Sequence, residues 1–239
     1  MMLEGQVALV TGASRGIGRG IALALADAGA QVALAARASD RLRSIEQEIR
    51  DRGGKAAALP VDLAEEPQIE SLFARLAETY GRLDILVNNA GIGLFGALSD
   101  FSSEDFDRLV AVNLKAVFLC CRQAMRLMIP RRAGYIINIS SVVGFKGYPY
   151  QSVYTATKHG VMGITKSLAV EAQPHGIRVS AVLPGGTDTD MSVPVRPDLK
   201  RSELLQPEDI ARTVLFLLSL SPRAAIDQIY IRRRKSAPF

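Results

Sequence analysis

The stretch VALVTGASRGIGRGIALALA, residues 7–26, decides the fold class. Its first residues, Val7–Val10, form a short apolar run typical of a buried parallel strand. Glycines follow at positions 12, 16 and 18, and then a run rich in Ala and Leu that favours a helix. A strand, a glycine-rich loop and a helix in this order form a phosphate-binding arrangement, because the glycines let the backbone approach a pyrophosphate and the helix N-terminus offers N–H groups. On this element alone, the alternative is a glycine-rich turn that serves only packing.

Apolar runs and helical stretches alternate along the rest of the chain. Further strands are expected at Gln31–Ala36, Ala56–Val61, Leu83–Val87, Tyr135–Ile139, Ile177–Leu183 and Ile226–Ile231. Helices are expected between them, at about Asp40–Arg52, Pro67–Tyr80, Ser103–Met128, Tyr154–Glu171 and Pro207–Leu220. This alternation predicts an α/β, Rossmann-type fold, a doubly wound parallel sheet of about seven strands with helices on both faces. No linker, internal repeat or low-complexity segment interrupts the pattern, so we expect residues 1–239 to form a single domain.

The composition narrows the class of protein. The chain has 239 residues, 48% of them hydrophobic, which suits one large core. The net charge of +5 comes largely from the four basic residues Arg232–Lys235, so we expect a solvated tail and no nucleic-acid-binding face. No signal peptide and no apolar run of membrane-spanning length is found, and the two cysteines, Cys120 and Cys121, are adjacent. We therefore expect a cytoplasmic protein without membrane contact.

Polar side chains and glycines follow the expected strands at their carboxyl ends, where doubly wound sheets bind ligands. After the second strand, where an acidic residue would bind the ribose 2′-hydroxyl of NAD, the chain has Ala36 and Arg37. Arg37, with Arg15 from the glycine loop, could clamp a 2′-phosphate, so we predict NADPH rather than NADH. The alternative is that Arg37 only faces solvent. Asp62, after the third strand, could accept a hydrogen bond from the adenine amino group or cap the next helix.

A tyrosine and a lysine four residues apart, Tyr154 and Lys158, lie on one face of an expected helix. A phenol has a pKa of about 10 and exchanges protons poorly at neutral pH, and a nearby ammonium would lower that pKa. Ser141 follows the strand upstream, so its hydroxyl can face the phenol across a cleft. The three residues predict an acid/base device that moves a proton on or off an alcohol oxygen. The alternative is a pair of surface residues, since Tyr and Lys often occur at this spacing.

Two further observations concern polar residues elsewhere. Asn113 is an amide among apolar neighbours in an expected helix, and such a group needs hydrogen-bond partners. It is either a satisfied structural residue or a group that holds a water beside the site. His159 and His175 have no neighbouring metal-ligand residues, so we expect no metal.

These motifs resemble those of the short-chain dehydrogenase/reductase superfamily over nearly the whole chain, and most of all its 3-oxoacyl-carrier-protein reductases. The matching motifs are TGASRGIG at residues 11–18, NNAG at residues 88–91, Asn113, Ser141, the Tyr154 and Lys158 pair, and Pro184–Gly185 with Thr189.

The resemblance implies a catalytic set of Ser141, Tyr154, Lys158 and Asn113. Tyr154 would donate the proton and Ser141 would orient the carbonyl. Lys158 would lower the tyrosine pKa and bind the nicotinamide ribose, and Asn113 would hold a water in the proton relay. The implied NADP(H) contacts are Gly12, Ser14, Arg15, Gly16, Ile17, Gly18, Arg37, Asp62, Leu63, Asn89, Ala90, Gly91, Tyr154, Lys158, Pro184, Gly185, Thr187 and Thr189.

The resemblance also implies an activity and an assembly. We expect reduction of a carbonyl, in a 3-oxoacyl group or a related ketone, to a secondary alcohol. Two alternatives stay open: an NADP-dependent alcohol or sugar dehydrogenase working oxidatively, and a non-catalytic NADP(H)-binding regulatory protein. Family members are often tetramers, so we expect a homo-oligomer, dimer or tetramer, that uses the helices around Asn113 and after Tyr154. The segment Ala225–Arg232 lacks the glycine-rich pattern of many oxoacyl reductases, which leaves the acyl-carrier substrate open.

Overall fold

All seven strands belong to one parallel sheet in the computed structural model, which describes residues 1–192 and 200–238. The strands are β1 (Val7–Thr11), β2 (Gln31–Ala36), β3 (Lys55–Pro60), β4 (Ile85–Asn88), β5 (Gly134–Ile139), β6 (Ile177–Pro184) and β7 (Gln228–Ile231). Their order across the sheet is β3-β2-β1-β4-β5-β6-β7, and every neighbouring pair is parallel. The predicted α/β, doubly wound fold class is confirmed. The single-domain organisation stays a prediction.

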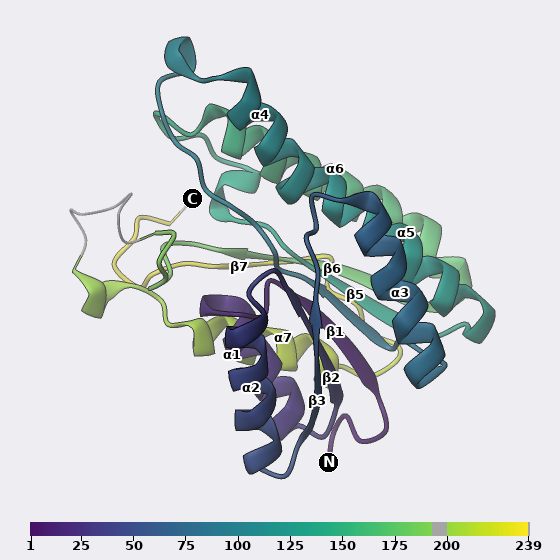
Figure 1. Cartoon of the computed structure of the whole chain (residues 1–239). Coiled ribbons are helices and arrows are strands. Elements are labelled where there is room, and N and C mark those ends of the chain that lie inside the picture. The colour runs from purple at the N-terminus through teal and green to yellow at the C-terminus, as the bar shows by residue number, and fades with distance from the viewer. Residues whose placement is uncertain (193–199, 239) are drawn as a thin grey trace.

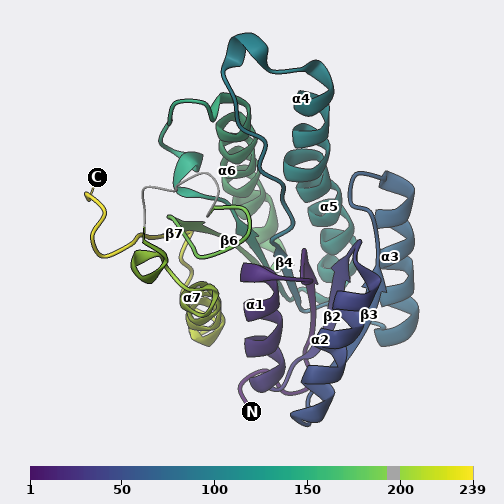
Figure 2. The same ribbon diagram turned by 60° about the vertical axis from the view of Figure 1, so that its left-hand side comes forward.

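Helices cover both faces of the sheet (Figure 1). One face carries α1 (Gly16–Asp27), α2 (Ser39–Asp51) and α7 (Pro207–Ser219). The other carries α3 (Glu66–Tyr80), α4 (Ser103–Val110), α5 (Ala116–Met128) and α6 (Ser152–Ala172). Figure 2, turned by 60°, shows the two helical layers on either side of the strands.

Strand β1 shows why the sequence folds this way. Ala8 and Val10 belong to the core under α1, α2 and α7, whereas Val7 and Leu9 belong to the core on the opposite face. A strand that is buried on both faces reads as a continuous apolar run, which is the pattern of residues 7–10. Strand β1 also has β2 on one side and β4 on the other, and the strand order reverses between β1 and β4. A crevice at this switch point is the usual ligand site of such sheets.

The expected helix Ser103–Met128 is divided in the structure. Helix α4 ends at Val110, a π-helical segment runs over Ala111–Lys115, and α5 begins at Ala116. The N–H of Ala116 bonds to the carbonyl of Ala111, five residues back, instead of four. Such π segments often occur at functional sites. Asn113 lies in the middle of this π segment, which is consistent with a role of the residue at a functional site.

Smaller differences concern element ends and loops. Strand β4 begins at Ile85 and β7 at Gln228, each two residues later than expected, which is within the usual uncertainty of such boundaries. Of the expected loop at residues 186–199, positions 193–199 lie outside the described residues. None of the helices within residues 1–192 and 200–238 combines the length and the apolar character that a membrane span requires.

A charged network closes the amino-terminal edge of the sheet below β1 and β4. Asp84, which is 8% exposed, accepts hydrogen bonds from the Val7 N–H at 2.8 Å and from Arg131 Nη1 at 3.0 Å. Arg82 donates to both carboxylate oxygens, at 2.8 and 2.6 Å. Burial alone would raise the pKa of Asp84, but the hydrogen bonds from Arg82, Val7 and Arg131 outweigh it and hold the pKa below its ordinary value.

Replacing Asp84 with Asn should destabilise the protein by about 2 kcal/mol at neutral pH, because two guanidinium groups and a buried N–H lose their anionic partner. A lowered pKa in the folded state contributes stability above the unfolded pKa, and that contribution disappears as the pH falls through the folded pKa. Denaturant unfolding of wild type and Asp84→Asn should therefore differ most near neutral pH and converge in acid. The exposed Asp107→Asn change on α4 is the control and should leave stability unchanged. A difference that is equal at all pH values would contradict the ionic explanation.

Candidate active site

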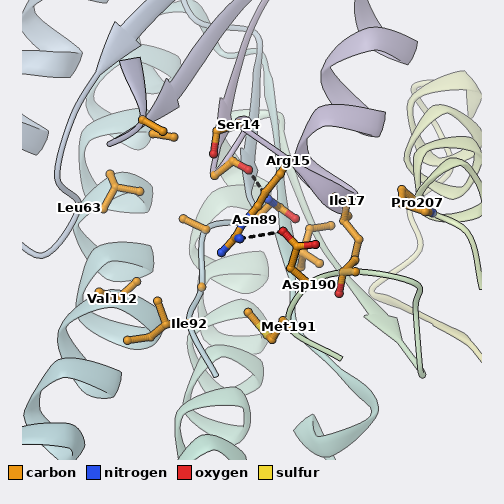
Figure 3. Close-up of a pocket in the computed structure, with 18 of the residues that line it drawn as sticks. Ser14, Arg15, Ile17, Leu63, Asn89, Ile92, Val112, Asp190, Met191 and Pro207 are labelled. Carbon is orange, nitrogen blue, oxygen red and sulfur yellow. Dashed lines mark hydrogen bonds and ion pairs between the residues drawn. The ribbon is translucent and has the colours of Figure 1, made fainter. Parts of the chain in front are cut away.

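A cavity of about 730 Å³ opens at the carboxyl ends of the strands (Figure 3). Its volume falls within the range typical of small-molecule sites. The predicted site residues that line it come from the loops after β1, β2, β3, β4 and β6, from the start of α1 and from α6. They are Gly12, Ser14, Arg15, Gly16, Ile17, Arg37, Asp62, Leu63, Asn89, Ala90, Gly91, Tyr154, Lys158 and Thr189.

The glycine loop has the geometry of an anion cradle. Gly12 and Gly16 have φ angles of 66° and 53°, a region that favours glycine. Helix α1 begins at Gly16 without a side-chain cap, so its first N–H groups have no side-chain partner there. A Cβ on Gly18 would lie 2.2 Å from the carbonyl oxygen of Gly12. Gly18 lies outside the cavity lining, and its lack of a side chain lets the loop close onto the helix. Its contact with the cofactor stays a prediction.

The turn after β4 is fixed against this loop. Thr11 Oγ1 accepts hydrogen bonds from the backbone N–H groups of Asn89, at 3.0 Å, and Ala90, at 3.1 Å. The Asn89 amide Nδ2 donates to the carbonyl oxygens of Thr11 and Gly12. A Cβ on Gly91 would lie 3.3 Å from Asn113 Oδ1 and 3.7 Å from Lys158 Nζ. These hydrogen bonds join the two loops into one wall of the cavity. The absence of a side chain at Gly91 leaves the space beside Asn113 and Lys158 open.

Arginines gather at the end of the cavity beside β2. Arg37 lines the cavity as predicted, and Arg41 from the first turn of α2 joins it. Arg41 was not among the predicted residues, although a basic residue in the first turn of the helix after β2 could have indicated a phosphate contact. Asp62 also lines the cavity, and its Oδ1 accepts a hydrogen bond from the Ala64 N–H at 3.0 Å. Asp62 therefore makes a local turn contact with Ala64 and also faces the cavity, where the predicted hydrogen bond with the adenine amino group stays a prediction.

Arg15, which also lines the cavity, pairs with the loop after β6. Its Nη1 lies 2.8 Å from Asp190 Oδ2, and Figure 3 shows this ion pair. The same loop approaches the glycine loop at a second point, because a Cβ on Gly16 would lie 3.2 Å from Thr189 Cγ2. Arg15 thus connects two walls of the cavity, and its contact with a 2′-phosphate beside Arg37 stays a prediction.

The predicted acid/base residues come together at the opposite end. Lys158 is 5% exposed, and its ammonium donates to the Ile139 carbonyl at 3.2 Å. The same Nζ lies 5.8 Å from the centre of the Tyr154 ring. Ser141 stands at the end of β5 in an extended conformation, and its hydroxyl accepts from the Val143 N–H at 3.3 Å. Ser141 does not line the cavity itself but is a hydrogen-bond partner of the Tyr154 phenol.

Burial controls both titrating groups. It raises the pKa of Tyr154 to about 12, against a smaller lowering by the hydrogen bond with Ser141. It lowers the pKa of Lys158 to about 8. Lys158 is not among the groups that shift the pKa of Tyr154 here, so its expected lowering of the tyrosine pKa stays a prediction. At neutral pH the phenol keeps its proton and most of the lysine is charged, which suits proton donation.

Asn113 is fully buried in the π segment and its side chain is occupied by protein partners. Its Oδ1 accepts from the Ile92 N–H at 2.8 Å, and its Nδ2 donates to the Ile92 carbonyl at 2.9 Å. A longer contact joins Nδ2 to Thr157 Oγ1 at 3.4 Å. These bonds satisfy the Asn113 amide within the protein and fix the backbone next to the cavity. The role of Asn113 in holding a water stays a prediction.

The remaining predicted residues support the cavity from outside. The Gly185 N–H donates to the Ile231 carbonyl at 2.8 Å, and Thr187 Oγ1 donates to the Gly185 carbonyl at 3.1 Å. Pro184, Gly185 and Thr187 lie outside the cavity lining, at the end of β6 beside β7. Their contacts with the cofactor stay predictions. The lining residues that the sequence did not single out are Ala36, Ala38, Arg41, Val61, Ile92, Arg108, Val112, Ile139, Ser140, Asp188, Asp190, Met191, Arg201, Gln206, Pro207 and Glu208.

Comparison with known proteins finds similar proteins that match most of the chain. A family model described as short chain dehydrogenase matches residues 6–200. The 3-oxoacyl-(acyl-carrier-protein) reductase of Staphylococcus aureus is 42% identical over 221 residues, which cover 89% of this chain and 90% of the relative. The protein of the same name from Synechocystis sp. is 40% identical over 229 residues, which cover 93% and 92%.

Solved structures are also similar. A metagenomic short-chain oxidoreductase in complex with NADP has a TM-score of 0.87 and 40% identity, over 97% of this chain and 99% of that one. An alcohol dehydrogenase from the archaeon Thermococcus sibiricus, complexed with 5-hydroxy-NADP, has a TM-score of 0.90 and 30% identity, over 98% and 99%. An actinorhodin polyketide ketoreductase with NADPH has a TM-score of 0.90 and 33% identity, over 98% and 97%.

The parallel sheet, the glycine loop and the cavity at the switch point define a Rossmann-type oxidoreductase. The chain belongs to the short-chain dehydrogenase family. The resemblance noted from the sequence is thereby confirmed, including its similarity to the 3-oxoacyl-carrier-protein reductases.

Proposed function

We propose that the protein is an NADP(H)-dependent reductase that converts a ketone, such as a 3-oxoacyl group, into a secondary alcohol. The observation that carries this proposal is the placement of Tyr154 and Lys158 together at one end of a cavity whose other end holds Arg37 and Arg41. The printed names of the relatives, reductases and a ketoreductase with NADPH, support it.

The cofactor is NADP(H). The residues present fit such a group: the positive φ angles of Gly12 and Gly16 and the uncapped start of α1 form a cradle for a pyrophosphate. Arg37 and Arg41 supply two guanidinium groups where a 2′-phosphate would lie. All three solved relatives described above hold NADP, NADPH or a derivative of NADP. When bound, the reduced cofactor supplies the hydride that reaches the carbonyl carbon.

The chain's own residues supply the proton. Tyr154 donates its phenolic proton to the carbonyl oxygen as the carbon gains the hydride, so that C=O becomes CH–OH. Ser141, the hydrogen-bond partner of the phenol, donates to the same oxygen and stabilises the charge that develops on it. Lys158, held by the Ile139 carbonyl, stabilises the phenolate that remains.

Asn113 acts in this scheme as a positioning residue. Its amide holds the backbone of Ile92, which lines the cavity, while its neighbour Thr157 lies one residue before Lys158 on α6. In the reductive direction Tyr154 donates its phenolic proton, whereas in the oxidative alternative its phenolate would act as the base.

The test is NADPH oxidation by the purified protein with a panel of carbonyls: a 3-oxoacyl thioester, a diketone and a quinone, each also with NADH. We expect NADPH-dependent turnover of at least one member and a slower reaction with NADH. A reaction without carbonyl measures the background. NADPH binding without turnover of any member would count against the reductase and favour the non-catalytic alternative.

Assembly and location stay predictions. Phe106 on α4, Phe118 on α5 and Val170 on α6 are exposed in the single chain, at 47%, 46% and 70%. These helices are the ones expected to meet in a dimer or tetramer, and burial of such side chains would favour it. The expected cytoplasmic location rests on the sequence.

A further inference from the structure

We propose that Phe95 determines which carbonyl substituents can reach Tyr154, admitting linear or flat ones and rejecting branched ones. The inference rests on the proposed function and names the substrate class of the same site. Phe95 does not line the cofactor-sized cavity. Its ring instead covers the catalytic phenol: the two ring centres lie 5.4 Å apart with an angle of 64° between the planes. This edge-to-face contact occupies space that a substituent on the carbonyl would need.

The segment that carries Phe95 is held at both ends. At one end, Asn113 bonds both the N–H and the carbonyl of Ile92. At the other, the Gly96 N–H donates to the Tyr150 carbonyl at 3.0 Å. Three residues separate Ile92 from Gly96, and Phe95 is one of them. Because the backbone is fixed at both ends, the ring is a preorganised wall rather than a loose side chain.

The contacts of the ring define the chemistry of this wall. A Cβ on Gly93 would lie 2.7 Å from both Cε2 and Cζ of Phe95 and 3.0 Å from Met191 Cγ. The ring therefore folds back over Gly93, where any larger residue would displace it, and Met191 lies beside the same point. Met191 lines the cavity (Figure 3). Because the Phe95 ring and Met191 meet at the same point beside Gly93, the ring extends the apolar surface that Met191 begins. An apolar ring and a thioether suit alkyl or aryl groups and offer no partner to a charged one.

The geometry thus favours a particular class of ketone. Next to its carbonyl, a 3-oxoacyl chain carries unbranched carbons on both sides, and an aryl ketone carries a flat group. Both can slide along an aromatic wall. A quaternary carbon beside the carbonyl is wide in all directions and would meet the Phe95 ring before its oxygen reached Tyr154. Specificity of this kind arises from an excluded shape rather than from an added attraction.

The test compares a linear 3-oxo ester with the same ester bearing a tert-butyl group on the keto carbon. We expect Phe95→Ala to raise the ratio of kcat/KM for the branched ketone to that for the linear one by about 10- to 100-fold. Phe95→Leu should raise it less, because a smaller apolar wall remains. Phe216→Ala, at an exposed aromatic position on α7, is the control and should leave the ratio at its wild-type value.

The two possible failures are distinguishable. If wild type turns over the linear ester and Phe95→Ala leaves the ratio unchanged, Phe95 does not set specificity and the inference is wrong, while the reductase stands. If wild type turns over neither ester nor any carbonyl of the panel, the proposed function is wrong, and the inference about Phe95 is wrong as well. The Kd for NADPH should stay at its wild-type value in both Phe95 variants, and if Phe95→Ala does not fold, Phe95→Leu decides by the same ratio.

Discussion

Replacing Tyr154 with Phe is expected to lower kcat for carbonyl reduction about 10³-fold and to leave the Kd for NADPH within about twofold of wild type. The change removes a single hydroxyl and keeps the ring, so the contacts of the ring with Phe95 and Lys158 are retained. Without the phenol, no group in the same place can protonate the carbonyl oxygen. Initial rates of NADPH oxidation and a fluorescence titration with NADPH separate the two quantities.

The matched control for this prediction is Tyr150→Phe. Tyr150 is 68% exposed, lies four residues before Tyr154 and contributes its backbone carbonyl to Gly96. Losing its hydroxyl should leave both kcat and the Kd near wild type. If Tyr154→Phe kept more than about a tenth of the wild-type kcat, the phenol would not be the proton donor. If the variant also lost NADPH binding, the site would be misassigned or the fold damaged.

The fold could be predicted because its signals are local. Residues 7–10 are apolar on both faces, which only a strand buried between two helical layers requires. The glycines at 12, 16 and 18 are readable because each meets a backbone demand: a positive φ at Gly12 and Gly16, and a close approach at Gly18. Such requirements restrict the residue type at single positions, so the sequence alone is enough to recognise them.

The details of the site depend on contacts that sequence spacing does not contain. The π segment at Ala111–Lys115 brings Asn113 onto Ile92, a residue 21 positions away, and nothing in the helical pattern signals it. The pKa of Tyr154 depends mainly on burial, which the spacing of Tyr154 and Lys158 along the helix does not contain. The contact of Phe95 with Tyr154 joins the loop after β4 to helix α6, and only the folded sheet brings these two segments together.

Replacing Arg37 with Asp should lower the preference for NADPH over NADH by about 100-fold and thereby reverse it. The guanidinium lies in the wall of the cavity at the end of β2, where it would bond a 2′-phosphate, and an aspartate there would repel that phosphate and accept from a 2′-hydroxyl. The measured quantity is the ratio of kcat/KM for NADPH to that for NADH with the same ketone. Because Arg41 lines the same end, Arg41→Asp should shift the ratio in the same direction.

Arg75→Asp is the matched control, because it makes the same charge change at an exposed position of α3 outside the cavity. If Arg75→Asp and Arg37→Asp changed the ratio equally, the effect would come from the net charge of the protein and not from a phosphate site. If Arg37→Asp left the ratio unchanged while Arg41→Asp lowered it, Arg41 and not Arg37 would bind the 2′-phosphate. A contact with a doubly charged phosphate should also weaken with added salt, so the NADPH preference of wild type should fall as ionic strength rises, and that of Arg37→Asp should fall less.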